Sequence, residues 1–346
     1  MSGSSSGGSS PSQMNYNWLS FSIRYLVNVE DLNNVESAGN YIRHRRAPIV
    51  FKENGIYTVV YAPAVSGEMI AHGYQMNLAE LASRKNLPVD SLAKQGILLK
   101  RGAGDDLHEN SSCKDKNDQC GYEFCVIQDD IVEDVAGFLN PNKQIKRVSN
   151  VAFSYMIPAL DAIKAVATNP QFHVRYTSKD LMKYQSLYNV ETASASYILT
   201  GYLNIDGIGK TQNCKDNQKI ENENDQNGKF IGSKPTREKV AIEALMLTLT
   251  QFLFGAKQTR FKPIVEIEAI IVSFSEKPFN LPPINGDFAE YLKQVTSSAN
   301  AFADFLGISN VLINYYTKEK EEIRKEKDKV SLQAKENPVE VFKWTR

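Results

Sequence analysis

The stretch Ser20-Phe-Ser-Ile-Arg-Tyr-Leu-Val-Asn-Val29 has the clearest strand pattern in the sequence. The apolar members are Phe21, Ile23, Tyr25, Val27 and Val29, and the polar members between them are Ser22, Arg24 and Asn28. Successive side chains of a strand point to opposite faces, so this period of two predicts a strand with one buried face. The rest of the fold is interpreted outward from this strand.

A basic loop follows the strand between Asn28 and Pro48. Its cations are Arg43, His44, Arg45 and Arg46, and Tyr41 precedes them. Guanidinium groups form paired hydrogen bonds with phosphate oxygens and stay charged at any working pH, which favours a phosphate-binding loop. The alternative is a solvated cluster whose partners are the nearby carboxylates Glu30, Asp31 and Glu36. The residues alone leave both interpretations open.

Composition indicates a globular protein with one large core or two smaller ones. The 346 residues include 40 Lys plus Arg and 40 Asp plus Glu, so a nucleic-acid surface must be local, and the balance argues against a histone-like binder. No apolar run reaches the length of a membrane span, and the N-terminus lacks the pattern of a secretory signal. We therefore expect a cytoplasmic protein without a membrane partner, preceded by a flexible Ser/Gly-rich tail over residues 1–17.

Local signals predict alternating strands and helices after the loop. Asn54-Gly55 indicates a hairpin turn, Ser66 and Thr236 are predicted helix caps, and a helix is expected from Asp287 to Gly307. Residues 145–157, 187–205, 265–271 and 308–315 have strand patterns. This order predicts an α+β fold with an RRM-like (ferredoxin-like) sheet that carries helices on one face.

A polar segment from Lys100 to Cys125 is expected to be an inserted loop with a metal site. Its potential ligands are His108, Cys113, Cys120 and Cys125. Thiolates and imidazole are the ligands that zinc prefers, and a structural zinc would stabilise a loop that has no core. The spacing lacks a Cys-x-x-Cys pair, and Cys125 begins an apolar run, so a buried core thiol is the alternative. The fourth cysteine, Cys214, is expected to be unrelated.

Two further segments are candidates for phosphate contact. His173 and Arg175 would share one face of a short strand and could contact a nucleotide, although the residues alone favour an ordinary polar sheet face. The turn from Gly255 to Lys262 carries Lys257 and Arg260, and could equally be a helix stop followed by solvated cations. The sequence has no Walker loop, dinucleotide fingerprint or nucleophile elbow, so no catalytic grouping is predicted.

Several segments together resemble a known family. They are Val27-Asn-Val-Glu-Asp-Leu-Asn-Asn-Val-Glu-Ser-Ala-Gly-Asn40, Arg46-Ala-Pro48, Ala64-Val-Ser-Gly-Glu-Met69, Asp134-Val-Ala-Gly-Phe138, Gln171-Phe-His-Val-Arg175 and Phe254-Gly-Ala-Lys-Gln-Thr-Arg-Phe261. In order and spacing they are similar to the CRISPR-associated DevR-type backbone subunit of archaeal Cascade, in the RAMP superfamily. The cysteine loop is similar to an insertion in subtype I-D members, which favours that subtype.

The resemblance implies a hand-shaped protein with an RRM-like palm and large inserted finger and thumb loops. The palm would span residues 18–316, with insertions at about 100–145 and 158–235, and a charged C-terminal helix or tail would cover 317–346. Copies would form a filament along CRISPR RNA with other Cascade subunits. They would hold the guide by its sugar-phosphate backbone and leave its bases free for a target DNA strand.

The resemblance also implies roles for single residues. The guide-contacting residues would be Asn28, Ser37, Asn40, Arg43, Arg45, Arg46, His173, Arg175, Lys257 and Arg260. Related type III backbone subunits cut a bound target with an aspartate in the loop before the counterpart of Pro48, where this chain has Arg45. Glu36 or Asp31 would be the acid if this chain were a single-strand nuclease. A metal-stapled scaffold that ignores RNA is the third interpretation.

Overall fold

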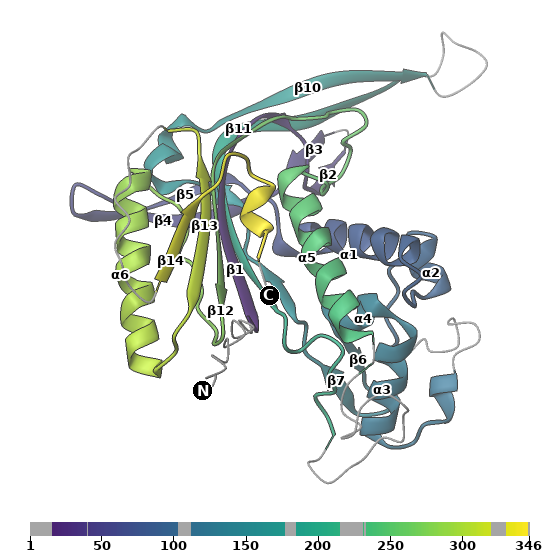
Figure 1. Ribbon diagram of the computed structural model, residues 1–346. Helices are drawn as coiled ribbons and strands as arrows, with labels where there is room; N and C mark the ends of the chain where they lie inside the picture. The colour runs from purple at the N-terminus through teal and green to yellow at the C-terminus, as the bar shows by residue number, and fades with distance from the viewer. Residues whose placement is uncertain are drawn as a thin grey trace, which may run out of the picture.

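The computed structural model describes residues 16–39, 41–102, 112–176, 185–214, 231, 233–319 and 330–344. Most of its strands belong to one large sheet (Figure 1). These are β1 (Trp18–Glu30), β2 (Asn34–Ala38), β3 (Tyr41–His44), β8 (Val151–Phe153), β9 (Ile157–Pro158), β10 (Ala167–Tyr176), β11 (Gln185–Asn204), β12 (Ile264–Ser275), β13 (Val311–Thr317) and β14 (Val330–Ala334). The order is β14-β13-β12-β1-β11-β3-β2, and β8, β9 and β10 also pair with β11.

Strand β1, which the alternating pattern predicted, lies at the centre of the sheet. Phe21, Ile23, Tyr25 and Val27 are fully buried. The polar face is buried as well, since the Ser20 hydroxyl donates to the carbonyl of Phe279 at 2.7 Å. A second hydrophobic cluster, which includes Phe279 and Leu281, covers that side of the sheet. The prediction of a single buried face was therefore wrong, because a segment distant in sequence covers the other face.

The core topology is ferredoxin-like, which confirms the predicted fold class. Helix α1 (Gly67–Arg84) follows β1, and α5 (Lys234–Thr250) connects β11 to β12. Antiparallel pairing places β1 between β12 and β11, and β8 and β9 pair with the far edge of β11. This is the βαββαβ arrangement of RRM domains. Figure 1 shows α1 and α5 on one side of the sheet and α6 (Phe288–Leu306) on the other.

The helix ends follow the predicted capping chemistry at most positions. The Ser66 hydroxyl accepts from the backbone N–H of Met69 at 3.3 Å, and the Asp287 carboxylate accepts from Glu290 at 2.9 Å. Gly307 ends α6 with a φ of +64°, a conformation that glycine adopts without strain. The predicted cap of α5 at Thr236 was wrong, because the helix begins two residues earlier at Lys234.

Two hairpins extend away from the sheet. Strands β4 (Arg46–Glu53) and β5 (Ile56–Pro63) form the hairpin predicted at Asn54-Gly55. Strand β10 pairs with the first half of β11 over ten register positions. In Figure 1 the β4–β5 hairpin extends to the left and the β10–β11 hairpin to the upper right.

The region expected to be an inserted loop contains helices. After the short helix α2 (Ser91–Lys94), its elements are the 3-10 helix η2 (Ser112–Asp115), α3 (Gln119–Asp129), α4 (Ile131–Ala136), β6 (Phe138–Asn140) and β7 (Ile145–Arg147). Asp118 caps α3 by accepting from the N–H of Gly121 at 2.7 Å, so the loop interpretation was wrong for the residues of η2 and for Gln119 to Cys125 of α3. Residues 145–157, expected as one strand, are split among β7, β8 and β9.

The C-terminal region also differs from its prediction. Residues 330–344 are not a charged helix or tail, because β14 adds in parallel to β13 and Val341 and Phe342 of the 3-10 helix η4 (Glu340–Phe342) enter the core. Another 3-10 helix, η3 (Leu160–Ala165), precedes β10. Among the described residues, no helix is both long and apolar enough to cross a membrane.

Candidate nucleic-acid interface

The predicted basic loop is a strand pair rather than an irregular loop. Strands β2 and β3 pair antiparallel, and β3 runs parallel to β11 with Tyr41 opposite Asn189. On the other edge of β11, Asn189 is paired with Phe172 of β10. Strand β11 therefore lies between the basic loop and β10, the strand that carries His173. Both predicted sites are thus at the same end of the sheet.

The cations of this loop have different environments. Arg43 is exposed, with its guanidinium carbon 5.8 Å from the centre of the Tyr41 ring. Arg46 is also exposed but pairs with Glu191 at 2.5 Å. Arg45 is half-buried, and His44 is buried. Two cations of the cluster thus reach the surface with exposed side chains.

His44 belongs to a buried network at the base of the loop. Its Nε2 lies 2.7 Å from the Glu30 carboxylate, which also accepts from the Tyr197 hydroxyl at 2.7 Å. Burial alone would lower the pKa of His44, but the hydrogen bond and charge of Glu30 outweigh it and raise that pKa above 6.5. His44 therefore ties β3 to the core instead of serving the surface.

Lys257 is also directed inward. Its ammonium nitrogen is covered and lies 3.1 Å from the carboxylate of Asp31, whose side chain is 0% exposed. Burial raises the pKa of Asp31, while the charge of Lys257 opposes that shift. Arg260, whose backbone N–H donates to the carbonyl of Lys257 at 2.9 Å in the next turn of the chain, is exposed. The loop therefore presents Arg260 outward and uses Lys257 in an ion pair with the end of β1.

The turn from Gly255 to Lys262, here called the glycine loop, is held closely against the end of β1. Gly255 has a φ of +97°, and a Cβ at this position would lie 2.5 Å from Cδ2 of Leu32. The N–H of Ala256 donates to the carbonyl of Leu32 at 2.8 Å. Phe261 contacts the ring of His173 edge to face at 5.1 Å between centroids. The structure thus brings the basic loop, the glycine loop and β10 together, although they are far apart in the sequence.

A bulge in β1 was missed by the sequence analysis. The pairing with β11 shifts between Val27 and Glu30, and Val29, expected inward, is 49% exposed with a φ of +55°. A β-branched residue in this conformation is a true outlier, and a bulge re-aims the side chains around it. Asn28, beside it, is half-buried. The continuous strand pattern gave no signal for this feature.

Some predicted residues cannot be placed. Asn40 and His108 lie outside the described residues, as do the side chains of Ser37, Glu36 and Arg175. Asp31 is buried and paired with Lys257, which does not suit an acid that must reach a nucleic-acid strand. Over the described part of the chain, the one group of His, Cys, Asp or Glu close enough to hold a metal is elsewhere, at Cys113, Cys125 and Asp129.

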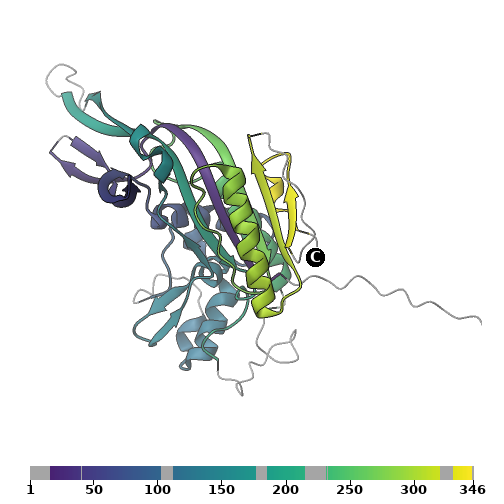
Figure 2. The ribbon, with the colours of Figure 1, turned by 90° about the vertical axis from the view of Figure 1, so that its left-hand side faces the viewer.

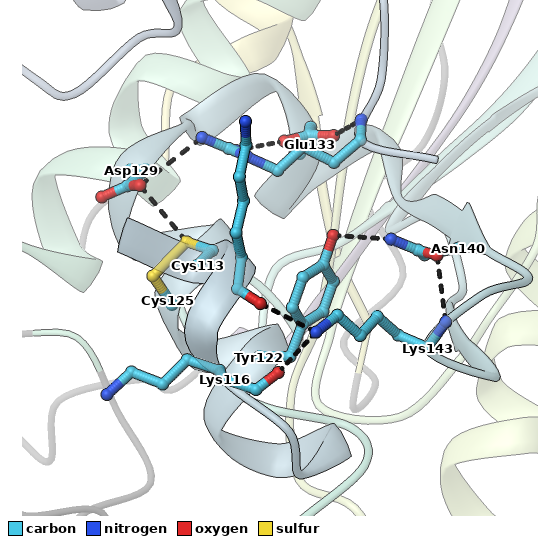
Figure 3. Close-up of a disulfide and its surroundings, with 10 residues drawn as sticks. Cys113, Lys116, Tyr122, Cys125, Asp129, Glu133, Asn140 and Lys143 are labelled. Carbon is cyan, nitrogen blue, oxygen red and sulfur yellow. Dashed lines mark hydrogen bonds and ion pairs between the residues drawn. A yellow bond between two sulfur atoms is a disulfide. The ribbon is translucent and has the colours of Figure 1, made fainter. Parts of the chain in front are cut away.

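The zinc prediction was wrong, because the cysteines form disulfides. Cys113 is bonded to Cys125 and Cys120 to Cys214, so none of them supplies a thiolate to a metal. Figure 3 shows the first bond beside Asp129, whose carboxylate lies 3.3 Å from Cys113 Sγ. Cys214, predicted to be unrelated, holds the segment after β11 against α3. Disulfides thus stabilise the region where a metal was expected.

The ferredoxin-like sheet, with its basic strand pair and projecting hairpins, defines an RRM-like palm with inserted arms. Residues 21–296 match the family described as CRISPR-associated negative auto-regulator DevR/Csa2, and the chain belongs to this family. This confirms the family suggested by the sequence segments. The description names Csa2 and not subtype I-D. The argument for subtype I-D was a metal-binding cysteine loop, and it no longer holds because the cysteines form disulfides.

Two curated relatives from one organism agree with this assignment. CRISPR-associated protein Cas7/Csa2 1 of Saccharolobus solfataricus is 64% identical over 313 residues, which cover 89% of this chain and 94% of that protein. CRISPR-associated aCascade subunit Cas7/Csa2 2 of the same organism is 37% identical over 280 residues, covering 80% and 84%. A chain of a solved structure described as a CRISPR RNA-guided surveillance complex, pre-nicking, is 9% identical, with a TM-score of 0.49 and coverage of 94% and 98%.

Proposed function

We propose that this chain is a backbone subunit of a Cascade complex that binds CRISPR RNA by sequence-independent contacts to the sugar-phosphate backbone. Family membership supports the proposal, as does the relative whose name describes an aCascade subunit. The observation that carries it is the meeting of three segments at one end of β11, where Arg43, Arg46 and Arg260 are exposed.

In this proposal the three arginines contact phosphates, because guanidinium groups match phosphate geometry and are never deprotonated. Asn28 and His173 lie at the same end of the sheet and would contact the guide as well. Arg45, Ser37, Asn40 and Arg175 remain candidates, while Lys257 would act through its ion pair with Asp31. Copies would follow one another along the guide and leave its bases to pair with a target DNA strand.

Fluorescence anisotropy with labelled single-stranded RNA tests these contacts. Arg43→Ala and Arg260→Ala should each weaken binding and reduce the slope of log affinity against log salt by about 0.7, the value for one phosphate on a single strand. Arg84→Ala is a matched control, because Arg84 is an exposed arginine of α1 that pairs with Glu80 and belongs to none of the three segments of this site. Unchanged affinity and slope in both test variants would overturn the assignment.

A further inference from the structure

The β4–β5 hairpin has two faces of very different exposure. Cross-strand pairing places Ile49 opposite Val60 and Ala47 opposite Ala62. On this inner face Ile49 and Ala62 are each 5% exposed and pack against Ile163 of η3. The hairpin is therefore anchored by one face and has a defined orientation on the molecule.

The outer face is exposed although it is largely apolar and aromatic. Its exposed residues are Arg46, Pro48, Val50, Lys52, Tyr57, Val59 and Tyr61, here called the tyrosine face. Tyr57 is 72% and Tyr61 69% exposed. A solvated face of an antiparallel sheet is normally polar, so this composition indicates a surface that binds something.

Charge on the tyrosine face has one sign. Lys52 and Arg46 are its charged residues, and the nitrogen of Lys52 lies 5.6 Å from the centre of the Tyr57 ring. The carboxylate of this hairpin, Glu53, belongs to the inner face and pairs with Lys164. Cations interleaved with open aromatic rings are what single-stranded nucleic acid requires, since rings stack on bases while cations contact phosphates.

We propose that the tyrosine face binds single-stranded nucleic acid, with Tyr57 and Tyr61 stacking on bases and Lys52 and Arg46 contacting phosphates. The two tyrosines are four residues apart on one strand face, a separation of about 13 Å, so each would take a different base. Arg46 begins β4 directly after β3, so the face continues from the basic loop. The inference rests on the proposed function, because the single strand that the face binds would be either the guide or its target.

Helix α6 does not cover the β4–β5 hairpin. In Figure 1 the two overlap in the view, but Figure 2, turned by 90°, shows the hairpin apart from α6. A second copy of the chain is the competing occupant, because valine and tyrosine also occur in protein interfaces. The complementary charge of a phosphate backbone favours nucleic acid, because the face carries Lys52 and Arg46 and no carboxylate of its own, although Arg46 also pairs with Glu191 of β11.

The test compares the full chain with Tyr57→Ala/Tyr61→Ala and with Tyr57→Phe/Tyr61→Phe, which keeps the rings. One arm measures the binding of labelled single-stranded RNA to the protein. A second arm measures the binding of complementary single-stranded DNA to protein that already holds RNA. We expect the alanine pair to weaken binding about 30-fold or more in one arm, with the phenylalanine pair close to wild type. Loss in the RNA arm identifies the guide, and loss in the DNA arm alone identifies the target.

Two results would overturn the inference. Wild-type affinity of the alanine pair in both arms would remove the binding role, and loss of self-association by light scattering with unchanged affinity would assign the face to a second copy. Arg43→Ala is measured in parallel. It shows whether a negative result concerns the tyrosine face alone or the proposed function as well. If Arg43→Ala weakens RNA binding and the alanine pair does not, the tyrosine face alone is wrong; if wild type binds neither strand, both proposals fail.

Discussion

Removal of the long-range disulfide should cost more stability than removal of the short one. The bond between Cys120 and Cys214 has a sequence separation of 94, and the bond between Cys113 and Cys125 a separation of 12. Loop-closure entropy then predicts losses of about 4.7 and about 3 kcal/mol for the two double serine variants. The order of the two losses is the sharper prediction, because native strain affects single values.

The folded structure around Cys214 should survive the change, because other contacts hold it. The buried carboxylate of Glu123 accepts from the backbone N–H groups of Gln212 at 2.9 Å and Asn213 at 2.8 Å, and pairs with Arg147 at 2.6 Å. The loss should therefore arise mainly in the unfolded chain, as the entropy argument requires.

Guanidinium unfolding measures both losses, once thiol titration has counted the cysteines. All four cysteines should be unreactive in the denatured, unreduced protein, and the variant lacking Cys120 and Cys214 should be the less stable of the two. A reductant should lower the stability of wild type and leave the four-serine variant unchanged. Four reactive thiols in wild type, or equal stability of all variants, would refute the pairing.

Two further predictions concern the buried ion pairs. Because Glu30 raises the pKa of His44 above 6.5, the pair should stabilise the fold fully below that pH and lose its effect as pH rises through the raised pKa. The stability difference between wild type and His44→Gln in urea should thus shrink as the pH rises above 6.5; a constant difference would contradict it. Lys257→Met should lower stability by about 1–3 kcal/mol, the cost of leaving the buried Asp31 carboxyl without its partner, yet leave the salt slope of RNA binding unchanged. A slope reduced by about 0.7, as for Arg43→Ala, would show that Lys257 contacts a phosphate.

The central sheet could be predicted because its signals are local. Alternation identified β1, and caps at Ser66 and Asp287 identified the starts of two helices. The bulge at Val29 could not be predicted, because the alternation continues through it and only the pairing with β11 shifts. Strand β14 was missed because its short segment follows a charged run and is stabilised by pairing with β13.

The candidate site was predicted in composition but not in orientation. A cluster of cations indicates a surface, yet His44 and Lys257 turn inward to Glu30 and Asp31, which depends on how β3 and the glycine loop pack on the end of β1. The zinc prediction from the cysteines was wrong for a similar reason. Spacing within residues 100–125 favoured one metal site, whereas Cys120 pairs with Cys214, which only the tertiary fold brings near.

The central claim is that the chain lines up along a guide RNA without reading its sequence. Native mass spectrometry of the protein with single-stranded RNAs of increasing length and unrelated sequence tests it most directly. The account predicts that bound copies increase by one for each fixed increment of RNA length, whatever the sequence. One copy at every length, binding limited to one sequence, or no binding would contradict it.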